Sequence, residues 1–250
     1  MLKIRSEQMA AMDQLALKQF EDRTVAELEQ SFPKHARLLG KEKLSGIVHG
    51  GFERARAYGL KSRDGLRLFV ELTLLLGHGF DLDPMVSWAA EILNDRETEE
   101  AARVERLFQK VTEYLQRVVG PDEAYLSAAL EKVRREAPEG FAQSGVNRFE
   151  DYMLNRFLLL YPEKCGYVGE EALRRLVQNA VQRARRYGLT TERGATTLLG
   201  LMFLLGIGFD EDPKFEFASK VLNDASLADP NQKADRLRAE ALEYLDKWRS

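Results

Sequence analysis

Two stretches of the chain, LLGHGFDLDP over residues 75–84 and LLGIGFDEDP over residues 204–213, each end in an Asp-x-Asp pair followed by proline. Carboxylates at this spacing can ligate a divalent cation. Phosphoryl-transfer chemistry needs further acidic ligands at set spacing, and a calcium loop needs more oxygen ligands and a later bidentate glutamate. The sequence shows neither set, so a metal-dependent enzyme built on the paired Asp-x-Asp is the most distant of three functional hypotheses.

A turn between two helices uses the same residue types. Aspartate followed by proline fits an N-cap with proline at the first helical position. A glycine at the start of each stretch fits the end of the preceding helix, and the phenylalanine fits an anchor in the core. We therefore predict a structural turn-and-cap role for ten residues: Gly77, Phe80, Asp81, Asp83, Pro84, Gly206, Phe209, Asp210, Asp212 and Pro213.

Two Arg-x-Arg pairs lie one helix before these aspartates. An anionic partner could bind them, but both the arginines and the aspartates occur in both copies. We therefore predict internal ion pairs to Asp81 and Asp210. The candidate arginines are Arg54, Arg56, Arg183 and Arg185.

Other catalytic patterns have little support in the sequence. The histidines, His35, His49 and His78, lack the i, i+4 spacing of a helical metal pair, and Cys165 has no histidine-and-base pattern nearby. The chain also contains no P-loop, no Gly-x-Ser-x-Gly and no His-Glu-x-x-His. We predict a protein that is not an enzyme and that has no catalytic residue, metal or cofactor.

The repeated stretches belong to a longer repeat. The offset from Gly77 to Gly206, 129 residues, also aligns RARAYGL at 54–60 with RARRYGL at 183–189 without a gap. This pattern predicts a tandem duplication. The expected divisions are a first unit over residues 1–119, a connecting helix and turn over 120–146, and a second unit over 147–250.

Positions that differ between the copies are candidates for a specific partner surface. Trp88 aligns with Phe217, and Val86 aligns with Phe215. Aromatic side chains dominate the energetics of interfaces as well as cores. For Trp88, Phe215 and Phe217, burial in the core is the first interpretation and partner binding the second.

The periodicity of the chain predicts an all-α fold, with roughly five helices in each of two pseudo-symmetric bundles. Leu173, Leu176, Val177, Ala180, Val181 and Ala184 share one helical face. Ser62, Thr191 and Asp229 stand where an N-cap is wanted. We also predict helices over residues 6–31, 84–93, 98–118, 121–136, 146–161, 213–222 and 230–248, and a turn-rich segment over 137–145.

Composition limits the partners and the compartment. The chain has 37 Lys and Arg against 40 Asp and Glu, which gives a net charge near −3 and does not favour nucleic acid as a partner. A single cysteine excludes an intrachain disulfide and favours a reducing compartment. Without a signal-peptide pattern or a long apolar run, we expect a cytoplasmic protein that does not insert into a membrane.

The sequence resembles a family of helical proteins encoded in bacterial type VI secretion gene clusters. The resembling segments are IRSEQMAAMDQLALKQFEDRTVAELEQSFP, ARAYGL, LLLGHGFDLDP and WAAEILND, all in the first copy. The resemblance covers residues 4 to about 115 well and about 147 to 245 less closely. It carries no catalytic residue over to this chain.

The resemblance implies a function in protein interaction. The first hypothesis is a non-enzymatic type VI secretion accessory protein, an effector adaptor or chaperone that binds a toxin or spike component. The alternative is an immunity protein that neutralises a cognate toxin, for which we expect a protruding surface of one charge. The sequence alone does not determine the oligomeric state.

Overall fold

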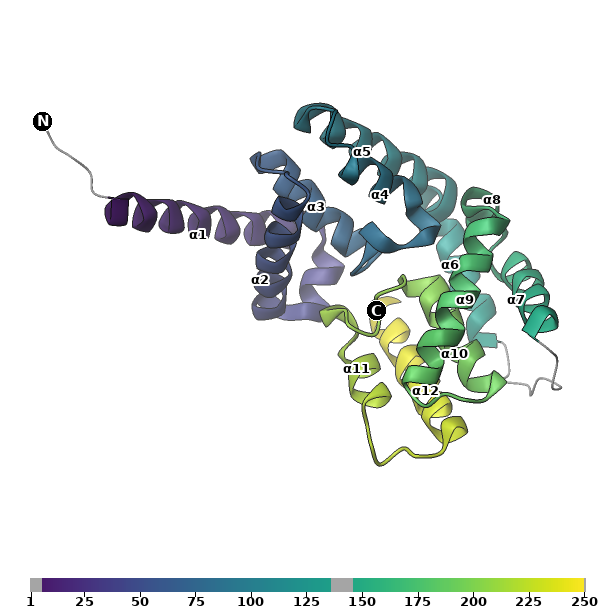
Figure 1. Ribbon diagram of the computed structural model, residues 1–250. Helices are drawn as coiled ribbons and strands as arrows, with labels where there is room; N and C mark the ends of the chain where they lie inside the picture. The colour runs from purple at the N-terminus through teal and green to yellow at the C-terminus, as the bar shows by residue number, and fades with distance from the viewer. Residues whose placement is uncertain (1–5, 136–145, 250) are drawn as a thin grey trace, which may run out of the picture. The chain divides into compact units, whose positions relative to one another are not determined.

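A computed structural model describes residues 6–135 and 146–249 (Figure 1). Every element in these ranges is helical, which confirms the predicted all-α class. No helix there is both long and apolar enough to cross a membrane. The turn-rich segment predicted over 137–145 lies outside the described residues.

The helices follow one another with short connections. In chain order they are α1 Ser6–Ser31, α2 Pro33–Ala57, α3 Arg63–Leu76, η1 Phe80–Leu82, η2 Pro84–Val86, α4 Ser87–Asn94, α5 Glu100–Tyr114, the π-helical turn η3 Leu115–Val119, η4 Pro121–Glu123, α6 Ala124–Arg135, α7 Val146–Leu160, α8 Pro162–Val168, α9 Glu170–Arg186, α10 Glu192–Leu205, η5 Pro213–Phe215, α11 Glu216–Leu222 and α12 Pro230–Arg249.

The chain divides into two compact units, Met1–Leu74 and Leu75–Ser250. The division falls within α3, at a different place from the boundaries that the repeat predicts. Those boundaries follow sequence similarity, whereas this division follows contacts, so the predicted units stay a prediction.

In the first unit, α1 packs against α2, with the rings of Phe20 and Phe52 stacked 5.0 Å apart. Helix α2 is kinked at Gly40, whose φ of +71° is outside the helical range. Ser62 caps the next helix, because its hydroxyl accepts a 3.1 Å hydrogen bond from Gly65 N.

In the second unit, α10 contacts both α9 and α12, and these three helices lie side by side in Figure 1. Helix α10 is apolar on most of its surface, which explains its central place. Its Phe203 stacks on Phe157 of α7 with ring centroids 4.0 Å apart. Helix α12 begins after the predicted cap Asp229, whose carboxylate accepts a 2.7 Å bond from Asn231 N.

One helix was missed. Helix α8 precedes α9 and is separated from it by Gly169, which has a φ of +83°. Proline at the first position of α8, and a glycine that aligns with Gly40 at the offset of the repeat, are the signals that could have predicted it.

Candidate functional site

Both repeated stretches form the predicted turn between two helices. Asp83 Oδ1 accepts a 2.8 Å hydrogen bond from Met85 N, and Asp212 Oδ1 accepts a 2.9 Å bond from Lys214 N. Proline follows each cap at the first position of η2 and η5. The phenylalanine and first aspartate of each stretch are buried, namely Phe80, Asp81, Phe209 and Asp210.

The two stretches also contact each other, and each aspartate cap bonds to the opposite stretch. Asp83 Oδ2 accepts a 3.1 Å hydrogen bond from Ile207 N, and Asp212 Oδ2 accepts a 2.9 Å bond from His78 N. One carboxylate therefore caps its own helix and holds the backbone of a stretch more than a hundred residues away. The pairing is reciprocal.

Glycine permits this close approach of two backbones. A Cβ added to Gly77 would lie 2.7 Å from Leu205 O, and a Cβ added to Gly206 would lie 2.7 Å from Leu76 O. Both glycines also have positive φ, +99° and +97°. The predicted helix-ending role of these glycines is thus joined by a contact role that requires the opposite stretch.

The second aspartate of each pair, Asp83 or Asp212, has a structural role. Both oxygens of Asp83 and of Asp212 accept backbone N–H groups, which leaves these carboxylates committed to the turn. Among residues 6–135 and 146–249, no three His, Cys, Asp or Glu side chains are grouped so as to hold a metal ion. The four hydrogen bonds show that Asp83 and Asp212 stabilise the turns.

Two buried lysines lie beside these carboxylates. Lys164 Nζ donates a 2.5 Å hydrogen bond to Phe203 O, and Lys214 Nζ lies 3.5 Å from Asp212 Oδ2. Burial lowers the pKa of Lys164 to about 8, against the opposing attraction of Asp83, and burial also lowers the pKa of Lys214. Burial raises the pKa of Asp83, while its two N–H bonds and Lys164 act in the opposite direction.

Lys164 is expected to contribute stability that rises with pH between about 8 and 10.5, whereas the buried Cys165 thiol, whose pKa is raised to about 11, acts in the opposite direction above about pH 9. Lys164 titrates near pH 8 when folded and near 10.5 when unfolded, so the unfolded chain binds more protons in this interval. The contribution of Lys164 to the free energy of unfolding is on the order of 1–3 kcal/mol. It is complete above pH 10.5 and is lost as the pH falls through 8. Urea unfolding at several pH values measures it, and Lys164→Met should reduce the slope.

A matched control is available for this measurement. Lys132 also donates to a backbone carbonyl, that of Leu159, but its side chain is exposed. Lys132→Met should leave the slope as it is in the unsubstituted protein. In the Lys164→Met variant, Lys214 should still make the free energy of unfolding depend on pH. If this variant has the same dependence on pH as the unsubstituted protein, the assignment to Lys164 is contradicted.

The ion pair predicted for the second stretch is present. Arg183 Nε lies 2.8 Å from Asp210 Oδ2, and Tyr187 donates a 2.6 Å hydrogen bond to the same oxygen. Arg183 also donates to Ile207 O, which ties α9 to the turn. Arg185, the other candidate on this helix, is exposed.

The arginines of the first copy differ from each other in the same way. Arg54 is half-buried on α2 and Arg56 is exposed. Helical periodicity explains the pattern, because residues two apart on a helix point in different directions. The expected pairing with Asp81 stays a prediction for both.

Two of the candidate partner-binding aromatics, Phe215 and Phe217, make internal contacts. Phe215 is buried, and its ring lies 5.1 Å from that of Tyr244 on α12. The half-buried Phe217 ring lies 5.8 Å from Tyr244, and Trp88 is half-buried on α4. These contacts fit the core interpretation better than the partner interpretation.

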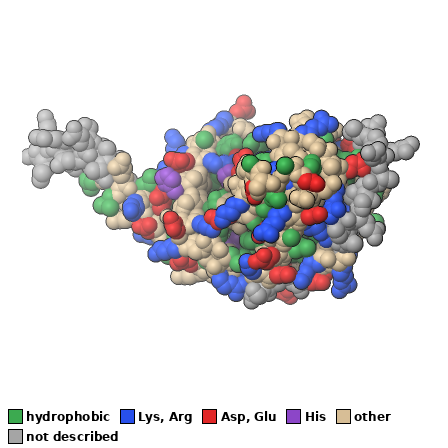
Figure 2. Space-filling model, turned by 90° about the horizontal axis from the view of Figure 1, so that it is seen from below, with side chains coloured by type: hydrophobic (Ala, Val, Ile, Leu, Met, Phe, Trp, Pro, Cys, Tyr) green, Lys and Arg blue, Asp and Glu red, His purple; other side chains and the backbone are tan. Residues whose placement is uncertain are grey.

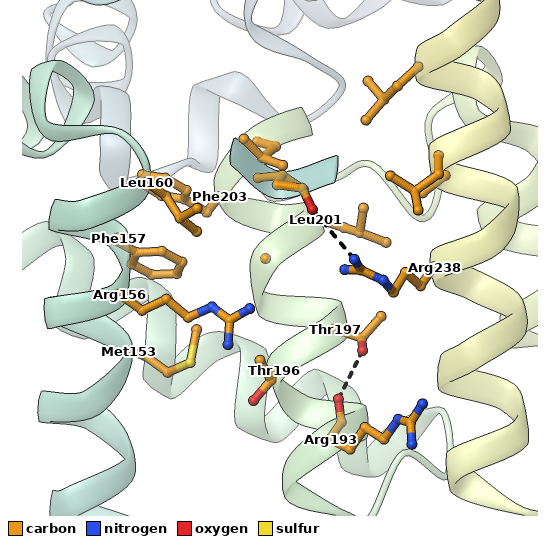
Figure 3. A pocket seen from close by; sticks show the side chains of 16 residues that line it. Met153, Arg156, Phe157, Leu160, Arg193, Thr196, Thr197, Leu201, Phe203 and Arg238 are labelled. Carbon is orange, nitrogen blue, oxygen red and sulfur yellow. Dashed lines mark hydrogen bonds between the residues drawn. The ribbon is translucent and has the colours of Figure 1, made fainter. Parts of the chain in front are cut away.

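A different feature, which the sequence did not reveal, is an apolar hollow in the second unit (Figure 3). Its volume is about 90 Å³, and α6, α7, α10 and α12 line it. Apolar side chains such as Met153, Phe157 and Leu160 form one wall, and Arg156, Arg193 and Arg238 add positive charge. The hollow depends on four helices that are distant in sequence, so no local pattern predicts it.

Charges of both signs are mixed on the surface. On the face shown in Figure 2, Lys and Arg side chains alternate with Asp and Glu side chains. This face therefore presents no broad field of one sign, such as a nucleic-acid-binding surface uses.

Comparison with known proteins gives no relative. No protein-family model, no curated protein and no solved structure matches the chain.

Proposed function

We propose that this protein is a non-enzymatic interaction module that acts as an adaptor or chaperone in type VI secretion. It binds a segment of a toxin or spike component noncovalently, in the cytoplasm, and keeps it competent for loading. The secretion context comes from the resemblance of the first copy to proteins of these gene clusters, and the single cysteine, buried as Cys165, suits a reducing compartment.

The observation that carries the proposal is the apolar hollow. A groove between helices is a common receptor for a peptide segment, because apolar anchors of the segment replace water against the side chains of the groove. Here α7 and α12 face each other across α10, and Phe157 and Leu201 belong to the lining (Figure 3). The conspicuous carboxylates Asp83 and Asp212 are meanwhile used within the fold.

Helix α7 also carries exposed apolar side chains outside the lining of the hollow. Leu158 and Leu159 are 51% and 76% exposed, and Tyr152 on the same helix is 41% exposed. Exposed apolar surface of this kind is typical of a protein-binding region.

We further propose that the chain arose by tandem duplication of a roughly five-helix unit. Equivalent contacts at the offset of the repeat support this origin. His35 Nε2 lies 3.2 Å from Leu74 O, and the aligned Lys164 bonds to the aligned Phe203 O. Thr191 caps α10 as Ser62 caps α3.

Affinity capture of the tagged full chain from its native host tests the proposed function. We expect a type VI toxin or spike component among the captured proteins, and we expect export of that component to fail in a deletion strain. Capture of a toxin whose activity kills the host when this protein is removed would instead assign the immunity role. Absence of every secretion and toxin component would overturn the proposal.

A further inference from the structure

The hollow combines an apolar floor with three arginine side chains at its rim, one of which, Arg193, is paired with Asp235. Its arginines come from three different helices, Arg156 from α7, Arg193 from α10 and Arg238 from α12. No Asp or Glu is found among the lining residues that the structure describes. In a chain with slightly more acidic than basic residues, this local composition favours an anionic ligand.

The arginines keep donor capacity for such a ligand. Arg156 Nη1 donates to the Tyr152 hydroxyl at 3.2 Å, Arg238 Nη2 donates to Val133 O at 3.4 Å, and Arg193 pairs with Asp235. Figure 3 shows Arg156 and Arg238 reaching toward the hollow from opposite sides. A guanidinium has five N–H donors, so an arginine that already contacts acceptors within the fold can also bind a carboxylate.

The floor of the hollow has room for a small apolar group. Its volume of about 90 Å³ is smaller than the roughly 150 Å³ of a protein cavity that holds benzene. One aliphatic side chain suits this space better than an aromatic ring. Thr196 Oγ1, also in the lining, is buried and has no hydrogen-bond partner among the described residues, so it can bond to a ligand.

We infer that the hollow binds a segment of a partner protein in which an aliphatic side chain is flanked by carboxylates. The aliphatic side chain enters the floor between α7 and α10, and Arg156 and Arg238 bind the carboxylates at the rim. That the occupant belongs to a protein rests on the proposed function. Its acidic and aliphatic character rests on the lining.

Gly200 provides a way to block the hollow without disturbing the fold. It lies within α10 and lines the hollow, and a Cβ added there has no other atom within 4 Å. Gly200→Leu therefore places a side chain in the space for the ligand and also favours the helix. Gly46 on α2 is likewise open and exposed, so Gly46→Leu is the matched control.

The test uses the full chain and a short fluorescent peptide of repeated Leu-Glu-Glu-Leu. We expect its binding, followed by anisotropy, to weaken about tenfold when glutamine replaces glutamate, because each charged hydrogen bond is lost. The double variant Arg156→Gln, Arg238→Gln should weaken the glutamate peptide to the level of the glutamine peptide. Gly200→Leu should abolish binding, and Gly46→Leu should leave it unchanged.

The outcomes separate this inference from the proposed function. Equal binding of glutamate, glutamine and lysine peptides would overturn the inference, as would binding that survives in folded Gly200→Leu. If native toxin or spike protein is still captured by Gly200→Leu, the proposed function stands and the hollow is not its site. If no such protein is captured while the peptide results hold, the hollow binds acidic segments and the secretion role fails.

Discussion

Replacing Gly206 with alanine is expected to destabilise the unit of residues 75–250 by about 3 kcal/mol or more. The alanine would need a φ near +97°, which is strained for a residue with a side chain. Its Cβ would also lie 2.7 Å from Leu76 O, a backbone atom that cannot rotate away. Urea unfolding followed by circular dichroism measures the loss.

Two further glycine variants make this result specific. Gly77→Ala should cost a similar free energy, because it meets Leu205 O at the same distance and has nearly the same φ. Gly200→Ala, in the helix before Gly206, should instead stabilise the protein by about 0.5–1 kcal/mol, since alanine favours the helix and the space is open. If Gly206→Ala were as stable as the unsubstituted protein, the two stretches would not pack as described.

Asp83→Ala should lower the free energy of unfolding by about 2–4 kcal/mol, and Asp212→Ala by a similar amount. Each substitution removes a helix cap and also leaves a backbone N–H of the opposite stretch, Ile207 N or His78 N, without its acceptor. Asp83→Asn keeps one oxygen acceptor, so its free energy of unfolding should fall between those of the unsubstituted protein and Asp83→Ala. Thermal and urea unfolding provide the measurements.

An ordinary cap is the appropriate control for these aspartates. Asp229 caps α12 at an exposed position, so Asp229→Ala should cost only about 1 kcal/mol. Unfolding of the unsubstituted protein should be the same in a chelator as in excess Mg²⁺ or Ca²⁺. Stabilisation by either ion that disappears in Asp83→Ala would show that the carboxylates hold a metal, and would contradict their structural assignment.

The local elements could largely be predicted from the sequence. Helix α1 spans the predicted residues 6–31, and Ser62, Thr191 and Asp229 cap the helices that follow them. A cap needs only a suitable side chain two or three residues before an unpaired N–H, so residue type and spacing are sufficient. Helix α8 was missed because seven residues give too little apolar periodicity to detect.

The sequence did not predict the hollow. For Phe215 and Phe217 it favoured core burial over partner binding, and both rings pack near Tyr244 within the fold. The hollow combines Arg156, Gly200 and Arg238 from three helices. An aromatic residue has the same local pattern whether it packs in a core or on a partner, and only its surroundings distinguish the two cases.

By itself, the sequence determined the class of the fold, its helix caps and the turn in each repeated stretch. Only the tertiary structure decided that the two turns meet, that Asp83 bonds to Ile207 N, and that Asp212 bonds to His78 N, 134 residues away. The physical reason is the range of the interactions. A cap joins neighbours along the chain, whereas the second oxygen of each carboxylate finds its partner only after the helices between the stretches have packed.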